Sequence, residues 1–324
     1  MIARCPKPQV VALSICLWLP AMGYQTPELE LSHAEKPPVF HTEAKLVACY
    51  ATVLNEKRRP VLNLSKESFT LYENDIPIPI LSFDREDVPV TLGLVIDNSA
   101  GMQDKRERVV AAAQSFVRES NPGDELFVVN FNDEAFLDLP SGEDFASDPD
   151  QLWHSLDRIA ASGESSMRDA VLKSLAHLKN GHKRDKVLVV VTNGKDTSSV
   201  TAEQALLTAA ADGDAVIYVV GLLNKANCGE EVGATRRDLG RLADATGGMA
   251  FFPKDVLGVE SIAHKIAREI RSRYFIGFRP GNTSVGRGQF RSIRLAVNGH
   301  KRWTVRTRTG YRYSAEEFAE GAAN

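Results

Sequence analysis

The chain has 324 residues, of which 43% are hydrophobic and 25% charged, and its formal net charge is −3. This composition is typical of a globular protein with a full core, and the length suggests about two domains. Neither zinc-type cysteine spacing nor an H-E-x-x-H sequence occurs, which excludes the common zinc-site signatures. The glycine-rich motifs that cradle nucleotide phosphates are also absent from the strand-to-helix turns.

The amino-terminal 23 residues have the layout of an export signal. Arg4 and Lys7 precede the apolar run 10–19, and the small residue Gly23 follows it. This run is too short to cross a bilayer. We therefore expect cleavage after about Gly23 and a periplasmic or secreted protein, with a retained signal as the alternative.

Two β-rich segments flank a longer α/β segment. Residues 24–44 are polar and contain prolines, which predicts a linker. Residues 45–88 contain short strands, and Pro77 and Pro79 restrict the last of them to a sheet edge. Residues 89–272 alternate continuous apolar strands with amphipathic helices. This alternation predicts a doubly wound, mostly parallel, Rossmann-like sheet covered on both faces.

The α/β segment begins with an apolar strand at 90–96, followed by a helix at 104–119 whose apolar residues share one face. A second strand at 125–131 is followed by an antiparallel edge strand at 134–140. The remaining predicted elements are helices at 150–159 and 168–178, a strand at 187–191, a helix from 201 that Gly213 ends, a strand at 215–220, a helix at 236–245, a strand at 249–252 and a helix at 256–271.

Strands return in residues 273–313, and a tail follows at 314–324. Apolar and polar residues alternate in 290–297 and again in 303–308, so we predict a hairpin whose loop has three or five residues. Neither β segment is large enough to be stable alone. We therefore predict that 45–88 and the carboxy-terminal strands pack together as one discontinuous antiparallel β-sandwich of about seven strands, with the α/β domain inserted between its halves.

Three polar loops are expected to meet where the parallel strands end. "DNSAGM" follows the first strand, "TNGKDTSS" follows the strand at 187–191, and "SGESSMRDA" leads into the helix at 168. In doubly wound sheets the ligand crevice lies at such strand ends. Hydroxyl, amide and carboxylate oxygens are the ligands that Mg²⁺ and Mn²⁺ prefer. The candidates are Asp97, Ser99, Ser165, Thr192, Asn193 and Asp196.

These loops resemble the metal-ion-dependent adhesion site of von Willebrand factor A-type domains, which has D-x-S-x-S in the first loop, a Thr in the second and the Asp of a T-D-G turn in the third. The flanks "LSKESFTLYENDIPIPILSFDREDVPV" and "RYFIGFRPGNTSVGRGQFRSIRLAV" resemble exported von Willebrand factor A-related acidobacterial domain proteins, over nearly all of 40–313. The resemblance implies a von Willebrand factor A-like fold and a binding role without catalysis. It also implies a protein partner whose acidic side chain completes the metal shell.

The match is incomplete at two positions. Asp97 and Ser99 occupy the first two ligand positions, and Ser165 takes the threonine position with its hydroxyl intact. Gly101 stands where the second serine belongs, and Asn193 where the aspartate belongs. One ligand oxygen and one negative charge are lost, so we expect a degenerate site with low occupancy by Mg²⁺ or Mn²⁺. The acids that could compensate are Asp196 and Glu164.

One alternative gives these residues purely structural hydrogen bonds. Asp97 and Ser99 could cap the helix after them and hydrogen-bond across the crevice, and Ser165 could cap the helix at 168. Asn193 and Asp196 could form Asx turns.

A second alternative uses the basic segment 271–312, which holds eleven Lys or Arg and no acid. Its arginines could bind an anionic envelope surface or an acidic protein without metal, whereas nucleic acid is not expected for an exported chain. A third, remote alternative is a serine hydrolase with Ser99 as the nucleophile, because its turn lacks only the first glycine of G-x-S-x-G. The histidine would then be His264 or His300.

Overall fold

The computed structural model describes residues 46–313 except 86, 140–141, 147, 158–159, 224–228, 282–287 and 301. The expected signal, linker and tail (1–23, 24–44 and 314–324) lie outside the described residues. In the part of the chain that is described, no helix is long and apolar enough to cross a membrane.

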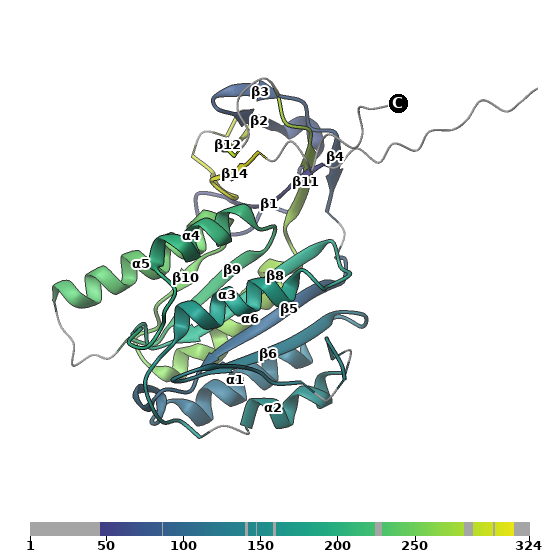
Figure 1. Cartoon of the computed structure of the whole chain (residues 1–324). Helices are drawn as coiled ribbons and strands as arrows, with labels where there is room; N and C mark the ends of the chain where they lie inside the picture. The colour runs from purple at the N-terminus through teal and green to yellow at the C-terminus, as the bar shows by residue number, and fades with distance from the viewer. Residues whose placement is uncertain are drawn as a thin grey trace, which may run out of the picture. The chain divides into compact units, whose positions relative to one another are not determined.

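Six strands form the central sheet of the α/β part (Figure 1). Their spatial order is β10 (Ala250–Phe251), β9 (Val216–Gly221), β8 (Asp185–Thr192), β5 (Val90–Asp97), β6 (Glu125–Phe131) and β7 (Ala135–Leu137). All neighbours are parallel except β7, which pairs antiparallel with β6 at the edge, as predicted. Every residue of β5 is buried, which is typical of a strand with helices on both faces.

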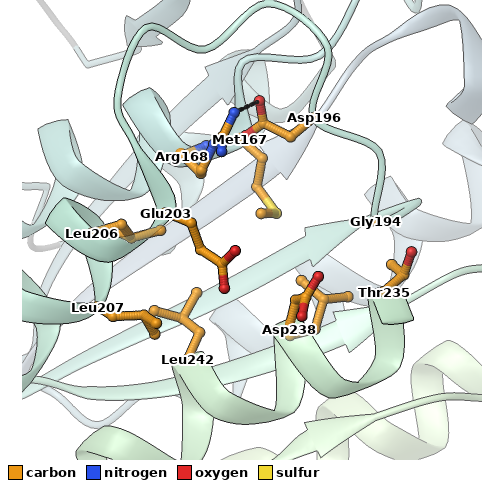
Figure 2. A pocket seen from close by; sticks show the side chains of 11 residues that line it. Met167, Arg168, Gly194, Asp196, Glu203, Leu206, Leu207, Thr235, Asp238 and Leu242 are labelled. Carbon is orange, nitrogen blue, oxygen red and sulfur yellow. Dashed lines mark hydrogen bonds and ion pairs between the residues drawn. The ribbon is translucent and has the colours of Figure 1, made fainter. Parts of the chain in front are cut away.

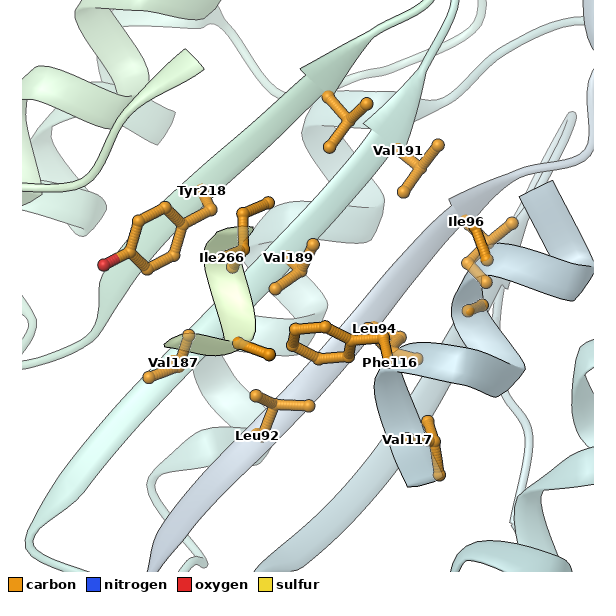
Figure 3. Close-up of a cluster of buried hydrophobic side chains, with 14 of the residues drawn as sticks. Leu92, Leu94, Ile96, Phe116, Val117, Val187, Val189, Val191, Tyr218 and Ile266 are labelled. Carbon is orange, nitrogen blue, oxygen red and sulfur yellow. The ribbon is translucent and has the colours of Figure 1, made fainter. Parts of the chain in front are cut away.

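Helices cover both faces of this sheet. The α-helices are α1 (Arg106–Arg118), α2 (Trp153–Asp157), α3 (Met167–Leu178), α4 (Glu203–Asp212), α5 (Glu230–Thr246) and α6 (Val259–Ile270), and the short 3-10 helices are η1 (Lys66–Ser68), η2 (Ala100–Met102), η3 (Pro149–Leu152) and η4 (Val256–Gly258). One apolar core lies between the sheet and α1, α2 and α6. Figure 3 shows part of it, with Phe116 of α1 and Ile266 of α6 beside Leu94 and Val189. A second core lies between the other face and α3, α4 and α5. The doubly wound prediction is confirmed.

Eight strands from the two ends of the described chain form two antiparallel sheets. One sheet has the order β13 (Thr304–Arg306), β1 (Val47–Leu54), β11 (Tyr274–Phe278), β4 (Ser82–Asp84), and the other β14 (Gly310–Arg312), β12 (Phe290–Val297), β2 (Phe69–Glu73), β3 (Ile76–Ile78). Each sheet mixes strands from before and after the α/β part. The apolar side chains of both sheets share one core. The sandwich prediction is therefore confirmed, and β3, which contains Pro77, lies at a sheet edge as expected.

The predicted hairpin between β12 and β13 is wrong. Strand β12 pairs with β14 along Phe290–Ser292 and with β2 along Ile293–Val297, and its pairing partners do not include β13. Strand β13 pairs instead with the end of β1 in the opposite sheet. Leu295 of β12 and Val305 of β13 still contribute to one core, but across the sandwich. Alternation alone does not distinguish neighbours on a ladder from residues of two facing sheets, because both turn every second side chain inward.

Strand β1 is buried on both faces. Cys49 and Ala51 belong to the sandwich core, whereas Tyr50 belongs to the core of the α/β part, as does Phe275 of β11. The Tyr50 and Phe275 rings lie 5.6 Å apart between centroids, and the Tyr50 hydroxyl donates to the Arg184 carbonyl at 3.0 Å. The β1–β11 sheet thus joins the sandwich to the α/β part.

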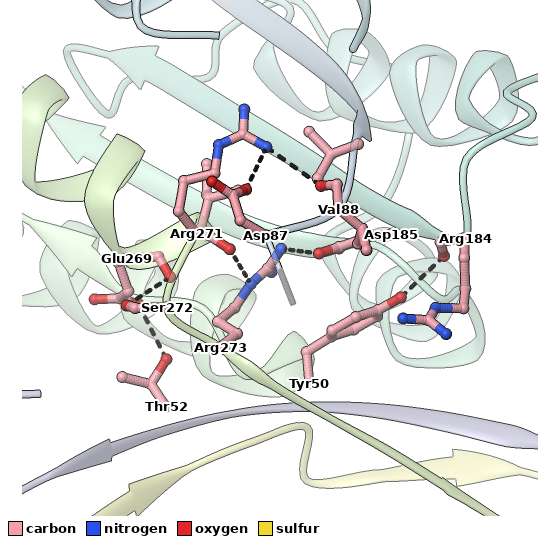
Figure 4. A network of polar contacts seen from close by, with 12 residues as sticks. Tyr50, Thr52, Asp87, Val88, Arg184, Asp185, Glu269, Arg271, Ser272 and Arg273 are labelled. Atoms are coloured by element: carbon pink, nitrogen blue, oxygen red, sulfur yellow. Dashed lines mark hydrogen bonds and ion pairs between the residues drawn. The ribbon is translucent and has the colours of Figure 1, made fainter. Parts of the chain in front are cut away.

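Buried ion pairs reinforce this junction (Figure 4). Arg273 donates to Asp185 at 2.5 Å, and both side chains are almost fully buried. Arg271, just after α6, pairs with Asp124 and donates to the Val88 carbonyl at 3.4 Å. The segments that enter and leave the α/β part are therefore tied to each other.

Candidate functional site

The carboxyl ends of β5 and β8 lie next to each other and carry the first set of candidate residues. The strand order reverses here, because β6 lies on one side of β5 and β8 on the other. Asp97 is the last residue of β5, Thr192 is the last of β8, and Asn193 follows directly. The loop before α3 completes the arrangement, since the Ala100 amide donates to the Gly163 carbonyl at 3.0 Å. All three predicted loops therefore meet at the switch point of the sheet.

Asp97 connects two of these loops. Its carboxylate is 2% exposed. Oδ1 accepts from the Ser99 amide at 2.9 Å, and Oδ2 accepts from the Thr192 hydroxyl at 2.9 Å and the Asn193 amide at 3.2 Å. Burial raises the pKa of Asp97 above its ordinary value, and these hydrogen bonds offset only part of the effect. A single buried carboxylate thus organises the centre of the site.

The Asn193 side chain has a fixed orientation. Oδ1 accepts from the Lys195 amide at 2.8 Å, which forms the predicted Asx turn. Because a backbone N–H only donates, the oxygen must face Lys195 and the NH₂ group must face the other way. Nδ2 accordingly donates to the Ser99 hydroxyl oxygen at 3.1 Å.

Ser165 connects the third loop to the β8 loop. Its carbonyl accepts from the Thr197 and Ser198 amides at 2.9 and 3.0 Å, and its own amide donates to the Thr197 hydroxyl at 3.2 Å. The Ser165 side chain is buried, and among the described residues its Oγ has no hydrogen-bond partner. An unpaired buried hydroxyl is uncommon in a folded protein, and the neighbouring Ser166 Oγ is unpaired as well.

The helix-capping alternatives for the serines and Asp97 are wrong. Helix α1 begins at Arg106, with η2 between it and the β5 loop, and its N-cap position is Lys105. The N-cap position of α3 is Ser166, whose side chain makes no capping hydrogen bond. The polar groups of the three loops bond to one another instead, which leaves them grouped at the crevice.

Among the residues described, Asp196 and Glu164, the acids that could replace the missing metal ligands, do not bond to Asp97 or Ser99. Asp196 Oδ2 accepts from the Arg168 amide at 2.8 Å, and Oδ1 accepts from its guanidinium at 3.2 Å. The Ser199 hydroxyl also donates to Asp196 at 2.9 Å. Glu164 is exposed, and its amide donates to Asp133 at 2.9 Å. Within the described residues, neither acid shares a hydrogen bond with Asp97 or Ser99.

Sequence analysis missed a polar network beneath the first loop. Lys105 Nζ donates to the Gly101 carbonyl at 2.9 Å with only 11% of its side chain exposed. Asn98 accepts from Arg106 at 3.0 Å and donates to Asn130 at 2.8 Å. The available signal was Asn130, a polar residue inside the apolar strand "ELFVVNF". This network links the first loop to β6 and to the start of α1.

As arranged here, Asn193 offers no oxygen to a divalent cation beside Ser99, because its NH₂ group faces that side. Both oxygens of Asp97 and the oxygen of Ser99 already accept hydrogen bonds, and Asn193 directs NH₂ toward Ser99. Among the buried candidates in the described residues, the Ser165 oxygen has no hydrogen-bond donor. A divalent cation requires about six oxygen ligands. Over the described residues, no three His, Cys, Asp or Glu side chains cluster in a way that could hold a metal ion.

A pocket of about 240 Å³ opens beside the crevice between α3, α4 and α5 (Figure 2). Its apolar lining includes Leu206 and Leu242, and the carboxylates of Glu203 and Asp238 project toward it. Arg241 pairs with both carboxylates. Gly194, in the β8 loop, belongs to this lining, so the pocket lies beside the loop that carries Asn193.

The expected basic surface does not form as a solvated face. Of the five arginines at 291, 294, 302, 306 and 308, Arg291 is buried against Glu73 at 3.3 Å, Arg306 pairs with the buried Glu269, and Arg308 donates to the Ala211 carbonyl at 2.6 Å. The exposed members are Arg294 and Arg302. Much of the basic charge is therefore used inside the protein.

The hydrolase alternative lacks its base in the described structure. His264 pairs with Glu119, and the His300 ring stacks on Trp303. No described histidine is hydrogen-bonded to Ser99, whose oxygen accepts from Asn193.

Comparison with known families assigns the fold. Residues 92–265 match the model of the von Willebrand factor type A domain. The chain belongs to this family. The match begins within β5 and ends within α6, so the von Willebrand factor A domain comprises the doubly wound sheet and its helices, including all three site loops.

Solved structures with similar folds include three bacterial proteins. A von Willebrand factor type A protein from Catenulispora acidiphila is 13% identical, with 86% of this chain and 77% of that chain covered and a TM-score of 0.49. An aerotolerance-related membrane protein from Bacteroides fragilis is 16% identical (56% and 98% covered, TM-score 0.45), and the pilus adhesin SpaC from Lactobacillus rhamnosus GG is 10% identical (82% and 48% covered, TM-score 0.47). No relative was found among curated protein sequences. At these scores the similarity transfers no function.

Proposed function

We propose that this von Willebrand factor A domain protein is an exported protein-binding module, without enzymatic activity, whose partner binds over the crevice at the carboxyl ends of β5 and β8. The observation that carries the proposal is the convergence of three polar loops at the switch point of the sheet, two of them bonded to the buried Asp97 and the third to the backbone of the first. Asp97, Ser99, Ser165 and Asn193 form the floor of the proposed contact surface. Membership of the acidobacterial subfamily, and the export signal at 1–23, are part of the same proposal.

The neighbouring pocket supports a partner of protein type. Interfaces combine an apolar centre with a polar rim. Here the apolar pocket lined by Leu206 and Leu242 adjoins a polar crevice, whose rim includes the exposed Glu164 and Lys195. A partner side chain that fills the pocket would place its neighbours over the crevice. The basic carboxy-terminal strands are less suited to this role, because several of their arginines are buried.

Charge reversal at the rim tests the proposal. Lys195→Glu and Glu164→Arg change exposed side chains, and Arg302→Glu is the matched control on the sandwich, where the side chain is 82% exposed. Each protein would be immobilised and used to capture partners from an envelope extract of the source organism, with quantitative mass spectrometry as the readout. We expect the control to retain the wild-type set and the rim variants to lose it.

Retention of the same proteins by all variants would place the contact elsewhere. Loss in the Arg302→Glu control alone would favour the basic strands.

A further inference from the structure

We propose that the crevice acts without a divalent cation, because the Asn193 amide occupies the place of a cation and Gly101 provides the space for it. This inference rests on the proposed function only for the crevice being the contact site. Hydrogen bonds of the Asn193 side chain hold the site together, and the partner contact needs no metal ion.

Gly101 and Asn193, the two positions that depart from the adhesion-site pattern, lie in contact with each other. A Cβ atom added at Gly101 would lie 2.6 Å from Asn193 Nδ2 and 3.5 Å from its Cγ. A separation of 2.6 Å is closer than real Cβ atoms come to another group. The glycine and the asparagine therefore fit each other, and any side chain at 101 requires Asn193 to move.

Asn193 is not free to move away. It is 7% exposed, its amide donates to Asp97, and its Oδ1 accepts from the Lys195 amide. Rotating the side chain would break the bond to Lys195 and withdraw the donor from Ser99. Gly101 is also held, because its carbonyl accepts from Lys105 Nζ. A serine at 101 would thus have to displace a buried side chain that two hydrogen bonds hold in place.

The amide makes the kind of contact that a cation would otherwise make. Nδ2 brings an N–H donor to 3.1 Å from the Ser99 oxygen, so this oxygen is satisfied without metal. The Thr192 hydroxyl and two amides satisfy the Asp97 carboxylate. A carboxylate at 193 would instead place a second negative charge beside Asp97 and turn an acceptor toward Ser99. The partner contact in this chain then consists of direct hydrogen bonds and survives chelation.

The test is a titration with Mn²⁺ and Mg²⁺ by calorimetry, together with thermal unfolding, on the full chain. The proteins are the wild type, Gly101→Ser, Asn193→Asp and the double variant. We expect no binding by the wild type and a lowered Tm for Gly101→Ser. The double variant is expected to bind Mn²⁺ and to gain Tm on its addition, because Asn193→Asp removes the NH₂ group that Gly101→Ser would meet and supplies the missing carboxylate oxygen.

Gly240→Ser is the matched control, since Gly240 lies in α5 and an added Cβ would meet nothing within 4 Å. If Gly101→Ser were as stable as this control, the claim that Asn193 leaves room only for glycine at position 101 would be wrong. Wild-type binding of Mn²⁺ that Asp97→Ala abolishes would overturn the proposal and leave the protein-binding role standing. Absence of binding in the double variant would also overturn it, because the two substitutions would not then be what excludes the cation. Failure of the rim variants to affect capture would bear only on the proposed function.

Discussion

Arg273, the residue before β11, pairs with Asp185, the first residue of β8, at 2.5 Å with their side chains 3% and 6% exposed. The pair joins the sandwich to the amino end of a strand whose carboxyl end carries the crevice. Burial by itself would lower the pKa of Arg273, but the facing Asp185 carboxylate, together with Tyr218, Tyr50 and Glu269, outweighs burial and raises it. The charge is therefore retained, with Asp185 as its directly bonded counter-charge.

Removing one member of this pair should destabilise the protein strongly. Arg273→Met leaves Asp185 buried without its counter-charge, which costs about 3–5 kcal/mol in comparable sites. The double variant Arg273→Met with Asp185→Leu removes both charges and should recover much of the loss. Urea unfolding of the single and double variants measures the coupling. Simply additive effects would show that the pair does not act as a unit.

Gly247, the C-cap residue of α5, should not tolerate a side chain. It ends the helix with φ at +84°, and an added Cβ would lie 2.6 Å from the Arg308 amide nitrogen. The left-handed conformation alone costs an alanine about 1–2 kcal/mol, and the contact with the backbone adds to this. Gly240→Ala, in the same helix and in open space, should instead stabilise by about 0.5–1 kcal/mol. Thermal unfolding of the two variants gives opposite signs if this account is correct.

Phe116 should dominate the core beneath α1. It is 4% exposed and lies among the side chains of β5 and α6 (Figure 3). Phe116→Ala should cost about 3–5 kcal/mol, because it removes buried area and leaves a cavity. Phe136→Ala, on edge strand β7 with 40% of the side chain exposed, is the matched control and should cost far less. Equal losses in unfolding free energy would contradict the assignment of α1 to this core.

Asp169 should make stability depend on acid pH. Burial would raise the pKa of its carboxyl, but hydrogen bonds involving Thr201 and Val200 outweigh it and lower the pKa. The Val200 and Thr201 amides both donate to Asp169 at 2.9 Å. An acid with a lowered pKa in the folded state contributes stability that is full above its unfolded pKa of about 3.9 and is lost as the pH falls through the folded value.

Asp169→Asn should therefore reduce the loss of stability below about pH 4. Urea unfolding at a series of pH values measures it, and Asp104→Asn, whose side chain is 80% exposed, serves as the control. An unchanged pH dependence in Asp169→Asn would show that this carboxylate does not cause the loss of stability in acid.

Strands were predicted well wherever burial leaves a strong pattern. β5 and β8 are continuous apolar runs because they are covered on both faces, and a run of this kind has few alternative structures. Helix α5 was predicted at 236–245 but begins at Glu230, since its first turns carry charged residues and no apolar stripe. The β12–β13 error arose because which strands pair is decided by the whole sandwich, whereas alternation is local.

The sequence was enough to predict which loops come together, but not which hydrogen bonds form between them. Asp97, Thr192 and Asn193 had to converge, because parallel strands end at one edge of the sheet. The fit between Gly101 and Asn193 joins two loops far apart in the sequence, and a glycine gives no indication of what lies beside it. Their spatial match is visible only when the loops are placed together.

The interleaving of the sandwich strands also determines the order in which the chain can fold. β1 pairs with β11, with Val47 opposite Phe278, so the first strands are made long before their partners. Closing so long a loop is slow and entropically costly. The α/β part contains its own sheet and can form first. In the folded α/β part, the Arg271 side chain at its carboxyl end bonds to the Val88 carbonyl at its amino end. The segments that carry β1–β4 and β11 are then close together, so their pairing no longer requires closure of a long loop.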